Sequence, residues 1–231
     1  MAHARELNTY PKLPANASIF TRLRLATVAL RALAEDAGDP YYAPLLHACL
    51  DGQVFARLAR SWREGDEGSA LLDARTTLQG RELDLEALAR LPDGTLGREF
   101  VRYFEVNGIE PFVSQYPVDS DVDYLSKRYR ETHDLFHLVT GYGTDEEGEM
   151  ELQAFVLGNL GLRQTVLILL FAVPRHFPGK SLAEIRAYLR RLYAAVLRGK
   201  RSRELLSVRY ERLWEEPVAA LADLLCAPAM I

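Results

Sequence analysis

Apolar residues recur every three to four positions along most of this chain, which is the period of an α-helix and not that of a β-strand. The first such run extends from Ile19 to Leu33, with Ser18 available as an N-cap and an Asp-Ala-Gly-Asp-Pro sequence after it. No run of period-two alternation is found. Further helices are expected over residues 45–62, 81–91, 96–106, 123–139, 147–171, 182–197, 203–213 and 218–225. The pattern predicts an all-α fold, a single-domain helical bundle.

The length of the chain favours one domain. A chain of 231 residues can bury one substantial core and is short for two. We expect the core of the domain to cover residues 17–226 and residues 1–16 to form an N-terminal extension. Residues 111–121 are expected to form an extended loop, and the Gly-Tyr-Gly sequence at 141–143 should break the chain between two helices.

Composition limits the choice of partners. The formal net charge is −4, so the clustered Lys and Arg surface that nucleic acid requires is not expected. Cys49 and Cys226 lie in apolar surroundings and belong to no metal or redox spacing. We therefore expect two buried thiols, with a long-range disulfide as the alternative.

The hydropathy of the chain predicts neither a signal peptide nor a transmembrane helix. The N-terminus includes an acidic residue, Glu6, and has no apolar segment of signal-peptide length. Arg163 divides the most apolar stretch, residues 152–174, so that neither half reaches the roughly 18 apolar residues that span a bilayer. The expected location is the cytoplasm, where the protein could contact the inner face of the cell membrane peripherally and could form a homo-oligomer.

The residues that could bind a metal ion or take part in catalysis are concentrated in one predicted helix. Two of the five histidines, His133 and His137, are four residues apart and lie on nearly the same helical face. Asp134 lies within reach of the same point. Two imidazoles and a carboxylate therefore converge from a single helix, as metal ligands do.

A divalent metal requires further ligands than one helix supplies. The break at 141–143 lets the chain reverse, and the next helix opens with several acidic residues. Among them Glu149 shares a helical stripe with Gln153 and faces inward, so an antiparallel return would place it opposite the histidines. The predicted ligands are His133, Asp134, His137 and Glu149 on a helix-turn-helix pair.

Other readings of the same residues stay open at this point. A zinc peptidase would have a Glu general base directly after the first histidine, where this chain has Asp134. A general-base role for Asp134 is the alternative to ligation. A metal-dependent phosphohydrolase would need an additional upstream histidine and downstream aspartate, for which His47 and Asp223 are available. Otherwise His47 is expected to be a core histidine.

At these residues the chain resembles a known family, the ubiquinone (coenzyme Q) biosynthesis proteins of the Coq-four type. The hallmark of that family, His-Asp-x-x-His followed after eleven residues by Glu, is matched by residues 133–137 and Glu149. Similar segments are residues 80–82, 91–97, 124–131 and 206–211. The resemblance extends from about Leu25 to Leu225, whereas the Arg-rich segment 176–203 departs from the family pattern.

The resemblance implies a function and a cofactor. The four motif residues would bind a divalent metal, usually described as zinc. The implied activity is that of a lyase in ubiquinone biosynthesis, the (oxidative) decarboxylation of a polyprenylated hydroxybenzoate ring. The alternative is a non-catalytic scaffold that binds polyprenyl lipid and organises other quinone-biosynthesis proteins. Arg130, beside the motif, is our candidate contact for the substrate carboxylate.

A polyprenyl tail also needs an apolar lining. The helix expected over residues 147–171 is more apolar than a helix that covers one side of a domain requires. We therefore expect an apolar cavity beside the metal, lined partly by this helix. The run from Val166 to Val173, taken alone, is more typical of core packing.

Overall fold

The computed structural model describes residues 13–14, 16–35, 41–79, 83–109 and 118–228. Within these ranges no strand is present, and one isolated bridge joins Thr95 and Pro217. The helices are α1 (Ile19–Glu35), α2 (Tyr42–Leu50), α3 (Gly52–Arg63), α4 (Asp66–Ala74), α5 (Leu85–Ala89), α6 (Leu96–Asn107), α7 (Asp121–Thr140), α8 (Glu146–Asn159), α9 (Arg163–Ala172), α10 (Leu182–Arg201) and α11 (Val218–Leu225), with the 3-10 turns η3 (Val173–His176), η4 (Leu205–Ser207) and η5 (Tyr210–Arg212). The all-α prediction is confirmed. The predicted N-terminal extension and loop 111–121 lie largely outside the described residues.

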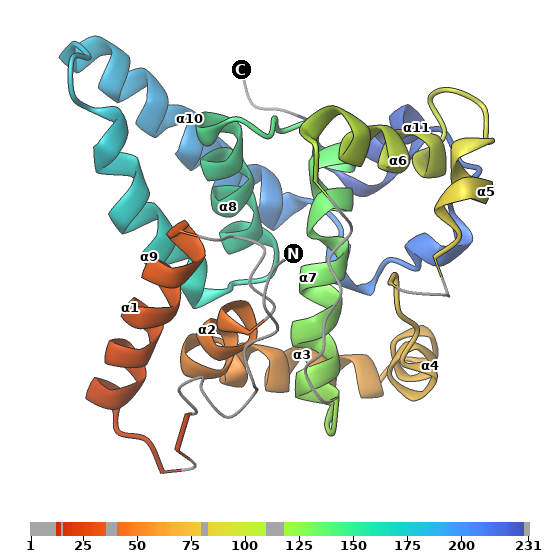
Figure 1. Cartoon of the computed structure of the whole chain (residues 1–231), viewed down its shortest axis with the longest axis horizontal. Coiled ribbons are helices and arrows are strands. Elements are labelled where there is room, and N and C mark those ends of the chain that lie inside the picture. Colours follow the sequence, from red (N-terminus) through yellow and green to blue (C-terminus); the bar gives the residue numbers. More distant parts are fainter. Residues whose placement is uncertain (1–12, 15, 36–40, 80–82, 110–117, 229–231) are drawn as a thin grey trace.

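Helix α7 runs through the middle of the molecule (Figure 1) and contacts α2, α3, α6, α8 and α11. Its Leu135 and Phe136 are fully buried in the main hydrophobic cluster, which extends from Val54 to Cys226. A smaller cluster joins α1 to α2 and includes Cys49. Both cysteines are buried free thiols, as expected. The predicted metal site therefore lies partly on a helix that is packed by five others.

Two of the predicted long helices are each broken in two. The helix predicted over 45–62 breaks at Asp51, and the helix predicted over 147–171 breaks at Gly161, whose φ of +72° lies in the left-handed region that favours glycine. The buried Asp51 carboxylate accepts hydrogen bonds from the backbone N–H groups of Arg163 (2.5 Å) and Gln164 (3.4 Å). One side chain thus lies at the first break and caps the new helix α9 after the second.

Residues 203–213 do not form the predicted helix. The segment contains only η4 and η5, because its backbone groups bond to side chains from elsewhere. The buried Arg128 guanidinium donates to the carbonyls of Leu206 (2.9 Å) and Val208 (2.6 Å). The Asn159 side chain accepts from the N–H of Leu205 (3.0 Å). The prediction also missed α4, which begins directly after Gly65.

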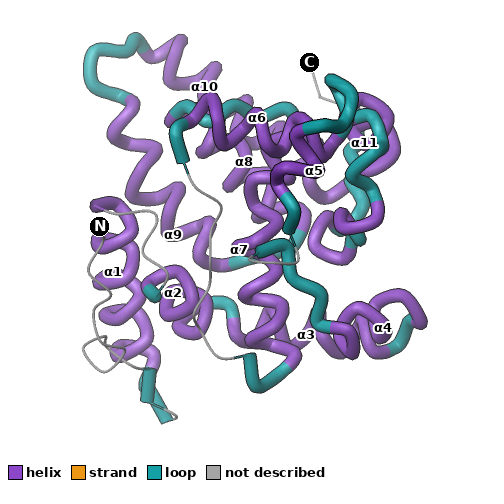
Figure 2. Tube along the Cα trace, turned by 45° about the vertical axis from the view of Figure 1, so that its right-hand side comes forward, coloured by secondary structure: helices purple, strands orange, loops and turns teal. Residues whose placement is uncertain are grey.

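Helix α9 is apolar from Val166 to Ala172, yet none of these side chains is buried. Leu170 is 67% exposed and Phe171 is 54% exposed. The interpretation of the run from Val166 to Val173 as core packing holds only in part: Val173 is buried in the main cluster, and Leu167, Ile168, Leu169 and Ala172 are half-buried against the two clusters. In both overall views, α9, η3 and the start of α10 form a corner that projects from the body of the protein (Figures 1 and 2). Within the described ranges, no helix is long and apolar enough to cross a bilayer.

Candidate metal centre

The start and the end of α7 are both defined by local hydrogen bonds. Ser120 and Asp123 form a capping box, in which the Ser120 hydroxyl accepts from the N–H of Asp123 (3.2 Å) and the Asp123 carboxylate accepts from the N–H of Ser120 (3.0 Å). At the other end, Gly141 adopts a φ of +76° and its N–H bonds to the His137 carbonyl (2.9 Å). These caps hold the two histidines in the last two turns of a regular helix.

The chain then reverses within a few residues and begins α8. Asp145 caps this helix by accepting from the N–H of Gly148 (2.7 Å). A Cβ atom at Gly148 would lie only 2.4 Å from the Gly143 carbonyl oxygen, so the close approach of turn and helix requires glycine here. The tight turn places Glu149, the next residue, opposite His133 and His137.

Three of the four predicted ligands converge. The Glu149 Oε1 atom lies 3.4 Å from His133 Nε2, and its Oε2 atom lies 3.0 Å from His137 Nε2. The two imidazole centroids are 5.1 Å apart. One ligand atom from each of the three residues falls within 4.8 Å of the others, so a single ion could contact all three.

Asp134 lies outside this three-residue group. Its carboxylate accepts a hydrogen bond from the Tyr103 hydroxyl on α6. The negative charge of Asp134 still acts on the centre, because it favours the protonated form of both histidines; for His133 this only partly offsets burial, which lowers the pKa. Asp134 therefore lies beside the centre, where Tyr103 holds it. The candidate ligands are His133, His137 and Glu149.

The orientation of His137 indicates that a cation belongs between it and Glu149. Its Nδ1 atom lies 3.0 Å from the Tyr142 carbonyl oxygen and must therefore carry a proton and donate. Its Nε2 atom faces the Glu149 carboxylate, which repels a bare lone pair. Burial opposes protonation of His137, but the hydrogen bond and charge of Glu149 outweigh it and raise the pKa of His137. A proton or a metal ion satisfies this arrangement.

The remaining electrostatics also suit a metal. Burial lowers the pKa of His133, which keeps its imidazole in the neutral form that binds metals. Burial would raise the pKa of Glu149, but the hydrogen bond from His137 and the charges of both histidines lower it to about 2, so the side chain is an anion. The Nδ1 atom of His133 is buried and has no hydrogen-bond partner among the described residues. Two imidazole nitrogens and one carboxylate form a donor set that suits a divalent ion such as zinc or iron(II).

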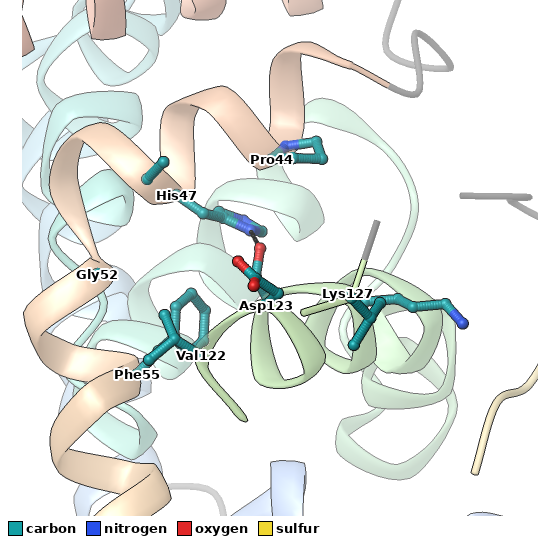
Figure 3. A pocket seen from close by; sticks show the side chains of 10 residues that line it. Pro44, His47, Gly52, Phe55, Val122, Asp123 and Lys127 are labelled. Carbon is teal, nitrogen blue, oxygen red and sulfur yellow. Dashed lines mark hydrogen bonds between the residues drawn. The ribbon is translucent and has the colours of Figure 1, made fainter. Parts of the chain in front are cut away.

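His47 is a core histidine, as expected, and lies near the centre without joining it. Its Nδ1 atom lies 2.6 Å from the Ser126 hydroxyl, in a cavity of about 60 Å³ between α2 and α7 (Figure 3). Burial, then the charges of Arg130 and His133, lower the pKa of His47 to about 3. Asp223 is exposed on α11 and belongs to no metal-binding group in the described ranges. The pair that a phosphohydrolase would need is therefore not assembled.

Arg130 acts on the centre through its charge, since it lowers the pKa of both His47 and His133. Sequence reasoning missed Tyr103, because no spacing in the sequence connects α6 to the motif. It also left Gln153 without a role. The Gln153 side chain donates to Glu149 Oε1 (2.8 Å), and its place on the same helical stripe was the available signal.

An apolar groove of about 770 Å³ lies between α1, the α2–α3 junction and α9. Its apolar lining is Ile19, Leu23, Leu50, Val166, Leu167 and Leu170. None of the three converging ligands lines this groove or the smaller cavity beside His47. The expected apolar lining is therefore present on α9. Neither of these two cavities, however, lies directly beside the metal ligands, as the expectation had placed it.

Comparisons with known proteins identify the family to which this helical chain belongs. The family model for the coenzyme Q (ubiquinone) biosynthesis protein Coq4 matches residues 18–226. The mouse and human mitochondrial COQ4 homologues are 32% and 34% identical to the chain over 164 residues, which cover 70% of this chain. The chain spans about 60% of the length of these relatives. A solved structure of a candidate ubiquinone biosynthesis protein from Nostoc punctiforme superposes with a TM-score of 0.70 at 25% identity, covering 88% of this chain and 95% of that protein.

The fold and the converging residues define a helical protein with a candidate metal centre between two consecutive antiparallel helices. More particularly, the chain belongs to the Coq4 family of ubiquinone biosynthesis proteins, since the family model covers nearly all of it.

Proposed function

We propose that this protein acts in ubiquinone biosynthesis as a metal-dependent decarboxylase of a polyprenylated hydroxybenzoate. The observation that supports this most directly is the convergence of His133, His137 and Glu149 within 4.8 Å. The names of the relatives support the pathway, and the groove beside α9 supports a substrate with an apolar tail.

The residues have separate roles in this proposal. His133, His137 and Glu149 hold the metal, and Tyr103 orients Asp134 beside it. A bound divalent ion supplies Lewis acidity, which stabilises negative charge developing on the substrate. Arg130 contributes a positive charge near the centre that favours a ring carboxylate. The groove binds the prenyl tail, with about 0.8 kcal/mol for each buried CH₂ group.

The reaction balances as follows. The bond between the ring and the carboxyl carbon breaks, carbon dioxide leaves, and the electron pair stays on the ring carbon. In simple decarboxylation that carbon takes up a proton. In the oxidative form, the oxygen of water becomes the new hydroxyl, one proton is released, and two electrons pass to an external two-electron acceptor such as dioxygen, which takes its remaining proton from solvent.

Purified protein incubated with a polyprenylated hydroxybenzoate tests the proposal. We expect release of carbon dioxide from labelled carboxylate, loss of release after chelation, and recovery on adding back zinc or another divalent ion. Glu149→Gln should also lose release, because this variant keeps the size of the side chain and removes the charge that would hold the metal. Release that survives chelation, or that Glu149→Gln leaves unchanged, would exclude metal-dependent decarboxylation at this centre.

A scaffold that binds polyprenyl lipid is the second candidate. The separation of the groove from the metal ligands favours it, because lipid binding does not then require the metal. In the same assay, with no other quinone-biosynthesis protein present, such a protein would bind prenyl lipid and metal but release no carbon dioxide.

A further inference from the structure

Three buried polar atoms near the candidate centre have no hydrogen-bond partner among the described residues. They are the Tyr129 hydroxyl, the Nδ1 atom of His133 and the Oε1 atom of Gln153. A buried polar atom without a partner lowers stability, and in folded proteins most such atoms are bonded to protein or to ordered water. Neither the convergence of the metal ligands nor the proposed chemistry uses these three atoms.

The side chains that carry these atoms gather around Glu149. Its Oε1 atom lies 3.4 Å from His133 Nε2 and accepts a hydrogen bond of 2.8 Å from the Gln153 amide. His133 and Gln153 therefore flank the same carboxylate oxygen. Tyr129 lies one helical turn before His133, with 6.1 Å between the two ring centroids, and the charge of Glu149 acts on its hydroxyl. We call Tyr129, His133 and Gln153 the inner polar cluster.

The Tyr129 hydroxyl is protonated and has no bonded neighbour among the described residues. Burial, then the charges of Glu149 and Asp51, raise the pKa of Tyr129, so its hydroxyl keeps its proton. The side chain of Gln164 on α9 lies close enough to oppose this shift, but it does not meet the geometry of a hydrogen bond. The hydroxyl is thus available both to donate and to accept.

The three atoms of the inner polar cluster offer different halves of a hydrogen bond. An imidazole that binds a metal through Nε2 carries its proton on Nδ1, so His133 offers a donor. The Gln153 amide nitrogen already donates to Glu149, so the Gln153 Oε1 atom offers an acceptor. A ligand that satisfies both must donate and accept at once. A hydroxyl group does so, whereas a carboxylate only accepts and would face both Gln153 Oε1 and the Glu149 anion.

We propose that the inner polar cluster is a binding site for a neutral hydroxyl group, which accepts a hydrogen bond from His133, donates one to Gln153 and bonds to Tyr129. Water supplies such a group in the substrate-free protein, and the ring hydroxyl of a hydroxybenzoate supplies it when substrate binds. The second source rests on the proposed function, whereas the first does not. In both cases the bound hydroxyl fixes the direction of His133 and Gln153, as partners of metal ligands commonly do.

Thermal unfolding of the full chain, followed by circular dichroism, tests the proposal without turnover, so its outcome is independent of the decarboxylation assay. Tyr129→Phe removes the hydroxyl and keeps the ring. We expect its melting temperature to fall by about 2–4 °C, the effect of one lost hydrogen bond in a protein of this size. The matched control is Tyr210→Phe, because the Tyr210 hydroxyl is also buried without a described partner and its ring packs against Phe136 in the core. The control should melt at the native temperature or above it, since it removes a polar group that has no ligand.

The same measurement with added 4-hydroxybenzoate or benzoate distinguishes the two sources, because these acids differ only in the hydroxyl. If the cluster takes the ring hydroxyl, 4-hydroxybenzoate should raise the melting temperature of the native protein more than benzoate does, and Tyr129→Phe should abolish the difference. If only water binds, the two acids should act alike, and a high-resolution crystal structure should show a water bonded to all three side chains of the cluster.

Two results would overturn the proposal. The first is a Tyr129→Phe variant that melts at the native temperature or above it, as the Tyr210→Phe control is expected to do. The second is a native protein that does not distinguish the two acids and whose crystal structure shows no water at the cluster.

Discussion

Each converging side chain at the metal centre has a hydrogen-bonding partner that sets its direction, with the exception of His133. Tyr142 supplies its carbonyl to His137, and Gln153 supplies its amide to Glu149. Tyr103 holds Asp134, the motif residue that the three-residue group omits. The spacing of the motif could predict the convergence, because four-residue intervals and a chain reversal are local features. Tyr103 could not be predicted in this way, because its position depends on how α6 packs against α7.

Tyr103→Phe tests whether this outer residue matters. The substitution keeps the ring, whose centroid lies 5.9 Å from that of His137, and removes the hydroxyl that orients Asp134. We expect the affinity for zinc to fall by about tenfold or more, as is usual when a partner of a metal-site residue is lost, with unchanged thermal unfolding of the metal-free protein. Competition with a chromophoric chelator measures the affinity. Tyr193→Phe, at an exposed position on α10, is the control, and equal affinities in the native protein and the two variants would refute the role of Tyr103.

Among the elements, the breaks in the helical pattern are less predictable than the helices themselves. The Gly-Tyr-Gly break at 141–143 was visible in the sequence, because it combines two glycines next to a helical run. The break at Gly161 was not predicted although the glycine is a local signal, because Asp51, which caps the helix that follows, is more than a hundred residues away in the sequence. Residues 203–213 were misassigned for a similar reason, because the Arg128 side chain on α7 donates hydrogen bonds to two of their carbonyl groups.

Asp51, which lies at the α2–α3 break and caps α9, makes the free energy of unfolding depend on pH. Burial raises the pKa of Asp51 from 3.8 to about 6, so the folded protein binds this proton more tightly than the unfolded chain does. The contribution of Asp51 to the free energy of unfolding is therefore fully present at low pH and declines as the pH rises from about 4 to about 6, by up to about 3 kcal/mol. Asp51→Asn cannot titrate. Urea unfolding at several pH values should show the difference between the two proteins changing in this window and level above it. Parallel profiles would show that Asp51 keeps an ordinary pKa.

At the scale of the whole molecule, the α7–α8 pair holds the candidate centre, and α9 and its neighbours form an apolar groove. The all-helical class followed from periodicity alone. The exposure of Val166, Leu170 and Phe171 on α9 did not, because an apolar helix is ordinarily buried and only the packing shows that one side of this helix is uncovered.

Complementation of a strain that lacks the activity separates a catalytic metal from a structural one. With His137→Ala, a catalytic centre should lose quinone production while soluble protein remains at the native level and a carboxylated intermediate accumulates, since a catalytic metal is not the main support of the fold. A structural metal would instead make the variant unfold or disappear, because its binding free energy is folding free energy. Quinone, intermediate and protein level are measured together, with Asp223→Ala, at an exposed position on α11, as the control. Native quinone levels in the His137→Ala strain would end the catalytic account.

The central claim is that His133, His137 and Glu149 together bind one divalent ion. Elemental analysis of the purified protein and of Glu149→Gln tests it most directly, with circular dichroism to show that both are folded. The account predicts one equivalent of a divalent metal, zinc in the first place, in the native chain, and a large loss of that metal in Glu149→Gln, because two imidazoles alone bind it weakly. Native protein that carries no stoichiometric metal after expression in zinc-supplemented medium would contradict this claim. A Glu149→Gln variant that keeps the full equivalent of metal would contradict it too.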